Sequence, residues 1–226
     1  MFIGHFGVAL AAKRVAPRTS LGTLVMAAQF VDLLWPVFLL LGIERVVIVP
    51  GATAVTPLDF IYYPFSHSLL TDVGWACLFA GLYKIVKGRS ALCLWFVVMS
   101  HWLLDALTHR PDLPLYPGSS RYVGLGLWNH RIGTLLVEGL IFAFGGMLYA
   151  HTARPRDRVG FYAYRSYIAA LVFIYFINIF GPPPSSEKAI AWGGLALWLF
   201  VAWAYWLDRH RRVDLPARQA SLPLNQ

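Results

Sequence analysis

The sequence predicts an all-α integral membrane protein with about six transmembrane helices and a short N-terminal re-entrant or interfacial helix. Hydrophobic residues make up 58% of the 226 residues, and charged residues only 13%, about half of the ~25% usual in a soluble domain. Six separate segments approach the ~20 apolar residues that a helix needs to cross a bilayer. These observations exclude a secreted disulfide scaffold, a disordered chain and a typical cytosolic α/β enzyme.

The six expected spans are residues 21–41, 69–86, 91–108, 132–150, 162–180 and 189–207. Residues 2–12 are also apolar but too few to span, so we expect a re-entrant or interfacial helix there. Residues 1–208 are predicted to form a single helical membrane domain. Residues 209–226 are predicted to be a basic, loosely structured cytoplasmic tail.

The net charge of +8 indicates membrane topology rather than binding of nucleic acid. Cytoplasmic loops of membrane proteins collect Lys and Arg. With both termini placed in the cytoplasm, most of the 19 basic residues fall in the inside segments. The sequence therefore predicts an even number of spans with both ends cytoplasmic, and the lipid bilayer as the main partner.

The predicted spans contain ionisable side chains, namely Asp32, His101, Asp105 and Glu138. Each such group costs about 2.5–3.5 kcal/mol on insertion scales. At a rise of about 1.5 Å per residue, their depths overlap between the middle and the outer half of the bilayer. No Lys or Arg lies at matching depth in any predicted span, so a simple cationic partner is missing. We therefore expect these groups to share one buried site.

The spacing of His101, Asp105 and His109 places all three on one helix face. A histidine and a carboxylate one turn apart can chelate a divalent cation, or the carboxylate can orient the imidazole. For His5, Asp32, His67, His101 and Asp105 together, a shared divalent site is favoured and a proton or ion relay is the alternative. His109 and His130 are more typical of loop histidines, and Asp72 of a charge at a helix N-terminus.

Four short motifs occur in order along the chain: Gly4-His5-Phe6, Phe30-Val31-Asp32, Phe65-Ser66-His67-Ser68 and Ser100-His101-Trp102-Leu103-Leu104-Asp105. Together they resemble the bacterial inner-membrane family of membrane-bound metal-dependent hydrolases (YdjM-like). That family is grouped with the zinc-dependent phospholipase C and nuclease superfamily, which has a helical fold. The resemblance covers roughly residues 1–150. It implies that His5, Asp32, His67, His101 and Asp105 are metal ligands.

The expected function is that of a membrane-embedded metal-dependent hydrolase, with zinc as the cofactor and a lipid-like ester or phosphodiester as the substrate. Asp32 is predicted to ligate the metal or act as a general base, and Glu138 is a further candidate catalytic residue. The alternatives are a transporter or proton relay that uses the same residues, and a non-catalytic membrane protein with a structural metal. The oligomeric state stays open.

Overall fold

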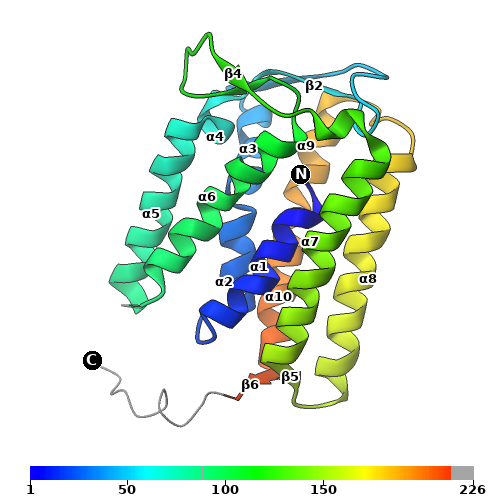
Figure 1. Cartoon of the computed structure of the whole chain (residues 1–226). Coiled ribbons are helices and arrows are strands. Elements are labelled where there is room, and N and C mark those ends of the chain that lie inside the picture. The colour runs from blue at the N-terminus through cyan, green and yellow to red at the C-terminus, as the bar shows by residue number, and fades with distance from the viewer. Residues whose placement is uncertain (88, 215–226) are drawn as a thin grey trace.

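The protein is mostly helical, as predicted, in a computed structural model that describes residues 1–87 and 89–214 (Figure 1). Five helical segments within these residues are long and apolar enough to cross a membrane, or six if a bent helix pair counts as one span. The predicted fold class and the approximate number of spans are therefore confirmed at this level.

The described helices occur in chain order as α1 (Ile3–Val15), α2 (Leu21–Ala28), α3 (Phe30–Leu40), α4 (Pro64–His67), α5 (Leu69–Lys87), α6 (Ala91–Thr108), α7 (Arg131–Thr152), α8 (Arg158–Phe180), α9 (Glu187–Leu195) and α10 (Leu197–Arg209). A short 3-10 turn, η1 (Leu127–Asn129), precedes α7. Helices α9 and α10 together form one apolar segment of 23 residues.

Short antiparallel strand pairs close both ends of the bundle (Figure 1). At one end, β1 (Arg45–Ile48) pairs with β2 (Leu58–Tyr62), and β3 (Leu113–Pro114) with β4 (Tyr122–Val123). We call this the loop end. At the opposite, tail end, β5 (Ala153–Pro155) pairs with β6 (Arg211–Val213). The sequence predicted no strands, because pairs this short leave no clear alternating pattern, and β6 lies in the segment predicted to be a loosely structured tail.

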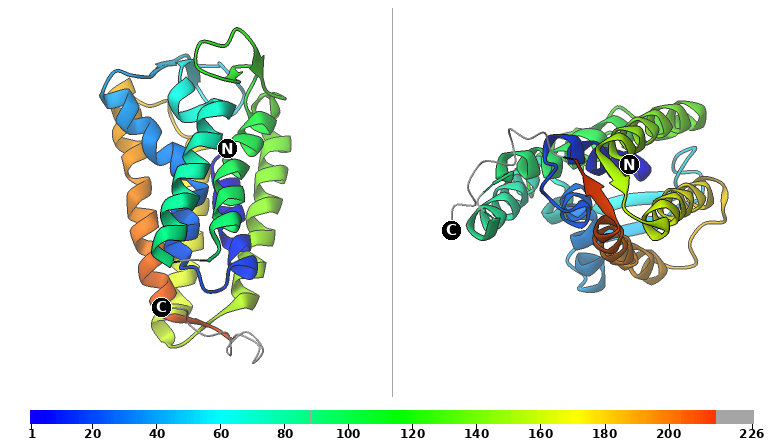
Figure 2. Two further views of the ribbon diagram at one scale, coloured as in Figure 1. Left: turned by 90° about the vertical axis from the view of Figure 1, so that its left-hand side faces the viewer. Right: turned by 90° about the horizontal axis from the view of Figure 1, so that it is seen from below.

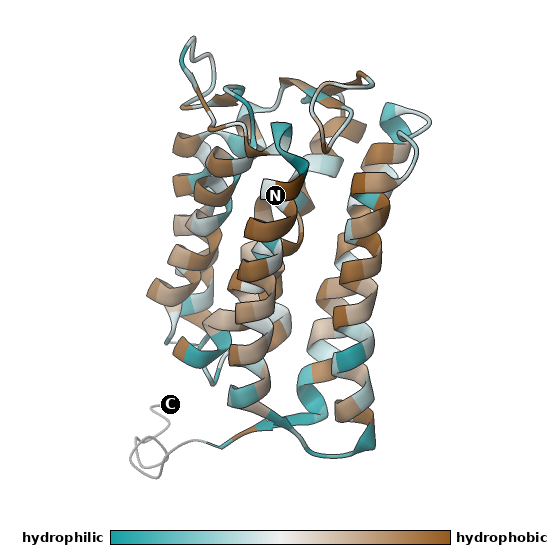
Figure 3. Cartoon of the chain, turned by 45° about the vertical axis from the view of Figure 1, so that its right-hand side comes forward, coloured by the Kyte–Doolittle hydropathy of each residue, from teal (hydrophilic) through white to brown (hydrophobic). Residues whose placement is uncertain are grey.

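The outer faces of the helices are apolar, and hydrophilic residues gather at the two ends (Figure 3). Between 17% and 44% of each candidate span is buried inside the protein. Large hydrophobic side chains such as Ile85, Phe96 and Leu140 are more than half exposed. So much exposed apolar surface is stable only in an apolar solvent, which supports a membrane protein.

Helix α1 lies inside the bundle rather than on its surface. His5, Phe6 and Leu10 are fully buried, and the N-terminus lies among the helices at mid-height (Figure 2). Gly7 of α1 meets Gly145 of α7 so closely that a Cβ at Gly145 would lie 2.0 Å from the Gly7 carbonyl oxygen. This arrangement carries His5 into the centre of the protein, and the re-entrant or interfacial position of α1 in the bilayer stays a prediction.

The first predicted span, residues 21–41, is broken. Helices α2 and α3 are bent by 56° relative to each other at Gln29. A helix end leaves its last carbonyl groups without intrahelical donors, so the break makes the Ala28 carbonyl available to another partner. Broken helices inside a membrane are tolerated where the freed backbone groups are buried in protein.

The predicted tail, residues 209–226, begins with described structure. Arg211 is buried, and its guanidinium donates hydrogen bonds to the carbonyls of Ala153 and Gly160. Residues 215–226 lie outside the described part of the chain. The predicted cytoplasmic location of both termini stays a prediction.

Candidate metal centre

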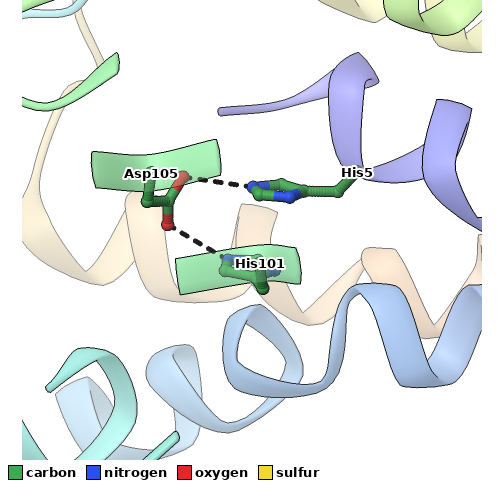
Figure 4. A group of neighbouring side chains, drawn as sticks. All are labelled: His5, His101 and Asp105. Carbon is green, nitrogen blue, oxygen red and sulfur yellow. Dashed lines mark hydrogen bonds and ion pairs between the residues drawn. The ribbon is translucent and has the colours of Figure 1, made fainter. Parts of the chain in front are cut away.

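Five side chains from separate parts of the sequence converge in the bundle. His5 comes from α1, Asp32 from the first turn of α3, His67 from the end of α4, and His101 and Asp105 from successive turns of α6. Figure 4 shows His5 and His101 directed toward Asp105. These are the five residues for which the sequence predicted a shared divalent site.

Asp105 lies at the centre of the group. Its Oδ1 is 3.1 Å from His5 Nε2, and its Oδ2 is 3.2 Å from His101 Nε2 and 3.8 Å from His67 Nε2. The α-amino group of Met1 also donates to Asp105 Oδ1. One carboxylate therefore meets three imidazoles, which come from three helices.

Asp32 completes the group on the opposite side. Its Oδ1 is 3.3 Å from His67 Nε2, and its Oδ2 is 3.6 Å from His101 Nε2. Two sets of ligand atoms each lie within 4.8 Å of one another: those of His5, His101 and Asp105, and those of Asp32, His67 and His101. His101 belongs to both sets, so an ion beside its Nε2 can be reached from either side.

The ring orientation of His101 is fixed by the broken span. Its Nδ1 lies 2.7 Å from the Ala28 carbonyl oxygen. A carbonyl only accepts hydrogen bonds, so Nδ1 carries the proton and Nε2 of the neutral ring presents a lone pair. Although Asp32 and Asp105 lie close by, His101 Nε2 is buried and forms no hydrogen bond with any described residue. This tautomer is the one that binds a metal through Nε2.

The same reasoning applies to His67. The hydroxyl of Ser66 donates to Glu44 Oε2 at 2.7 Å, so its oxygen accepts from His67 Nδ1 at 2.6 Å. Glu44 is itself fixed, since its Oε1 accepts from the backbone N–H groups of Phe65 and Ser66 at 2.8 Å each. His67 Nε2 therefore also presents a lone pair toward the carboxylates of Asp32 and Asp105.

His5 stacks face to face on His101, with ring centroids 3.6 Å apart and an interplanar angle of 6°. Two protonated rings at this separation would repel each other strongly in a buried site. The pair therefore favours at least one neutral imidazole. Lone pairs that face carboxylate oxygens also repel them unless a cation lies between. The arrangement thus fits a divalent ion held by imidazole and carboxylate groups.

The site is closed except on one side. The side chains of His5, His67, His101 and Asp105 are no more than 5% exposed, whereas that of Asp32 is 22% exposed. A water molecule or a substrate would therefore reach the group beside Asp32. An open position of this kind is typical of catalytic rather than structural metal sites.

Glu138, predicted as a further catalytic residue, has a different environment. It is buried, and its Oε2 accepts hydrogen bonds from the backbone N–H groups of Phe2 at 2.9 Å and Gly4 at 3.4 Å. These bonds hold the start of α1, the helix that carries His5. The structure thus indicates that Glu138 positions α1. Its catalytic role stays a prediction.

Sequence reasoning did not single out Glu44 or the Ala28 carbonyl, which orient His67 and His101. Glu44 is an acidic residue in an apolar stretch and is 2% exposed, but nothing local pairs it with Ser66, which lies 22 residues later. Asp72 lies in the first turn of α5, as predicted. It is nevertheless fully buried, and neither carboxylate oxygen has a hydrogen-bond partner among the described residues.

His109 belongs to a separate network in the loops above the site. Its Nδ1 donates to Asp112 Oδ1 at 2.9 Å, and Tyr63 donates to the same oxygen at 2.9 Å. Burial lowers the pKa of His109 and raises that of Tyr63 well above its ordinary value. Both side chains are therefore neutral near pH 7, and His109 serves the loop structure, as the sequence predicted.

A change at Ser66 tests whether the hydrogen bond to His67 matters. The variant Ser66→Ala removes the acceptor for His67 Nδ1 and frees the ring to turn. Loss of such an orienting partner weakens metal binding about 10–100-fold, which a competition titration with a chromophoric chelator would measure. The matched control is Ser100→Ala, whose hydroxyl donates only to the Val97 carbonyl. Equal affinities in the two variants would contradict the assigned role.

Comparisons of this chain with protein-family models, curated proteins and solved structures find no match.

Proposed function

We propose that the protein is a membrane-embedded metal-dependent hydrolase that acts on a lipid-like ester or phosphodiester. The observation that carries the proposal is the convergence of Nε2 atoms of His5, His67 and His101 on the carboxylates of Asp32 and Asp105. Three imidazoles and two carboxylates suit zinc. The motif resemblance to bacterial inner-membrane hydrolases supports the same class and that membrane as the location. The distribution of the basic residues along the sequence supports cytoplasmic termini.

The chain's own residues have distinct tasks in this proposal. His5, His67, His101 and Asp105 hold the ion, and Ala28, Ser66 and Glu44 fix the imidazole orientations. A bound zinc ion would lower the pKa of a water molecule to about 7 and polarise the substrate oxygen. Asp32 lies on the exposed side of the group, where its carboxylate can take up the proton of an attacking water.

The experiment compares hydrolysis of a panel of phospholipids and neutral glycerides by wild type and by Asp32→Asn. The variant keeps the size and shape of the side chain but removes the base. We expect hydrolysis of at least one lipid class by wild type, with a rate about 10²–10⁴-fold lower in the variant. A rate that is unchanged in the variant would remove Asp32 from the mechanism.

Two other outcomes distinguish the alternative functions. Bound metal without hydrolysis of any lipid on the panel would favour a structural metal. A proton flux in reconstituted vesicles that is lost in Asp32→Asn, in a protein without bound metal, would favour a proton relay. Either result would overturn the proposed hydrolase.

A further inference from the structure

A second feature of the bundle lies apart from the His/Asp group. An apolar cavity of about 620 Å³ runs between α7 and α8, with Ile3 of α1 in its wall. Its lining extends along α7 from Leu135 to Ala150 and along α8 from Tyr164 to Phe176. We call it the α7/α8 groove. From the structure we propose that this groove binds one acyl chain of a membrane phospholipid.

The lining residues have almost no free hydrogen-bonding or charged groups for a polar ligand. Two tyrosines contribute to it, but both hydroxyls already donate to backbone carbonyls of α7: Tyr164 to Gly146 at 2.8 Å and Tyr175 to Thr134 at 3.3 Å. No charged side chain lies among its lining residues. A hydrocarbon chain is the occupant that such a surface favours, because it gains contacts without leaving polar groups unpaired.

The dimensions also fit a single chain. At a rise of about 1.5 Å per residue, the lining extends for ~22 Å along α7 and ~18 Å along α8. One leaflet of a bilayer contributes about half of a hydrocarbon thickness of ~30 Å. The groove is therefore long enough for the chain of one lipid leaflet.

The groove opens onto the surface that faces the bilayer. Exposed apolar residues adjoin it on both helices, including Leu136 and Leu140 on α7 and Phe173 on α8. Lipids of the bilayer would therefore lie directly beside the opening of the groove. Because the groove is continuous with this surface, a phospholipid chain is a better candidate occupant than a soluble ligand.

A cationic group lies in line with the groove at the loop end. Arg131 begins α7 one turn before Leu135, so the two side chains share a helix face. Its guanidinium lies over the ring of Phe180, which ends α8, and donates to the neutral carbonyl of Ala54 at 2.7 Å. These contacts do not neutralise its charge. An anionic headgroup above an apolar chain is complementary to this arrangement.

The groove and the metal centre share α1. Ile3 lines the groove, and His5, two residues later, contacts Asp105. A phospholipid held in the groove would have its ester and phosphate groups near the loop end of α1. In naming phospholipid as the substrate class the inference rests on the proposed function, but binding in the groove needs no metal and is measured independently.

The test uses the full-length protein in nanodiscs of phosphatidylcholine and phosphatidylglycerol with a trace of phospholipid that carries a diazirine on its acyl chain. After illumination, peptide mass spectrometry locates the adducts. We expect adducts to concentrate on the lining segments of α7 and α8, and an excess of unlabelled phosphatidylglycerol to remove them. Chelation of metal should leave the pattern unchanged.

Two variants fill the groove. A Cβ at Gly139 meets no atom within 4 Å, and Ala143, one turn later, is an exposed residue of the lining, so Gly139→Leu and Ala143→Leu place larger side chains in the groove. Each should abolish the α7/α8 adducts. The matched control is Gly81→Leu on α5, where a Cβ also meets open space. Arg131→Gln should remove the preference for anionic over zwitterionic probe.

Three results would overturn the inference. Adducts spread as densely over the exposed faces of α5 and α10 as over α7 and α8 would indicate the general lipid annulus. Adducts retained in both filled variants would show that the groove is not the site. Crosslinks between two copies of the chain at α7 and α8, in place of lipid adducts, would identify the groove as a protein interface.

Discussion

Replacement of His101 should remove the bound metal from the purified protein. His101 is the one residue common to both potential ligand sets, and its Nε2 lies between the carboxylates of Asp32 and Asp105. His101→Ala leaves His5 and Asp105 on one side of an enlarged cavity and Asp32 and His67 on the other. We therefore expect the divalent metal content of the variant, measured by elemental analysis of protein purified without chelators, to fall to background.

A second substitution separates ligand loss from misfolding. In His101→Asn the side-chain amide can still donate to the Ala28 carbonyl but has no group in the place of Nε2. This variant should fold and remain without metal. The control is His151→Ala, at the exposed tail end of α7, which should keep the full metal content. If His101→Asn retains as much metal as wild type, His101 is not a ligand.

A bulky residue at Gly145 should destabilise the protein and lower its metal content, although Gly145 is not one of the candidate metal ligands. A Cβ at this position would lie 2.0 Å from the Gly7 carbonyl oxygen, which is backbone and cannot turn aside. Overpacking usually costs about 1–3 kcal/mol, and more where the obstacle is rigid. Because α1 must move away from α7, His5 should withdraw from Asp105. We expect Gly145→Leu to lower both the melting temperature and the metal content.

The matched control for this variant is Gly74→Leu on α5, where a Cβ meets no atom within 4 Å. It tests the effect of a leucine on an exposed helix face. Melting curves in detergent and elemental analysis should show wild-type values for this control. Wild-type stability and metal content in Gly145→Leu would mean that the contact between α1 and α7 does not position His5.

The sequence predicted the helical class and most span positions, because long apolar segments separated by turns leave a clear signal. It did not predict the break at Gln29. The segment 21–41 is mostly apolar, with Gln29 and Asp32 among its few polar residues, and neither Ala28 nor Gln29 is a typical helix breaker. At the break, the Ala28 carbonyl accepts a hydrogen bond from His101, which lies 73 residues later in the sequence.

The candidate site could be predicted because ionisable side chains cost free energy in an apolar solvent and are therefore rare in transmembrane segments. Asp32, His101 and Asp105 stand out in spans that otherwise contain few ionisable groups, and the i, i+4 spacing places two of them together. The supporting contacts left no such signal. The hydrogen bond between Glu44 and Ser66 depends on how the loop between α3 and α4 folds. Glu138 binds the start of α1 although it lies 136 residues from Phe2 in the sequence.

The most direct test of the central claim is a calorimetric titration of metal-stripped wild-type protein with zinc. The five convergent side chains predict a single saturable site whose affinity falls strongly in His101→Asn and moderately in Ser66→Ala. The affinity for zinc should also fall at acid pH, because histidine ligands must be neutral to bind a metal ion. Wild-type protein that is folded and takes up no zinc or other divalent ion would contradict the account.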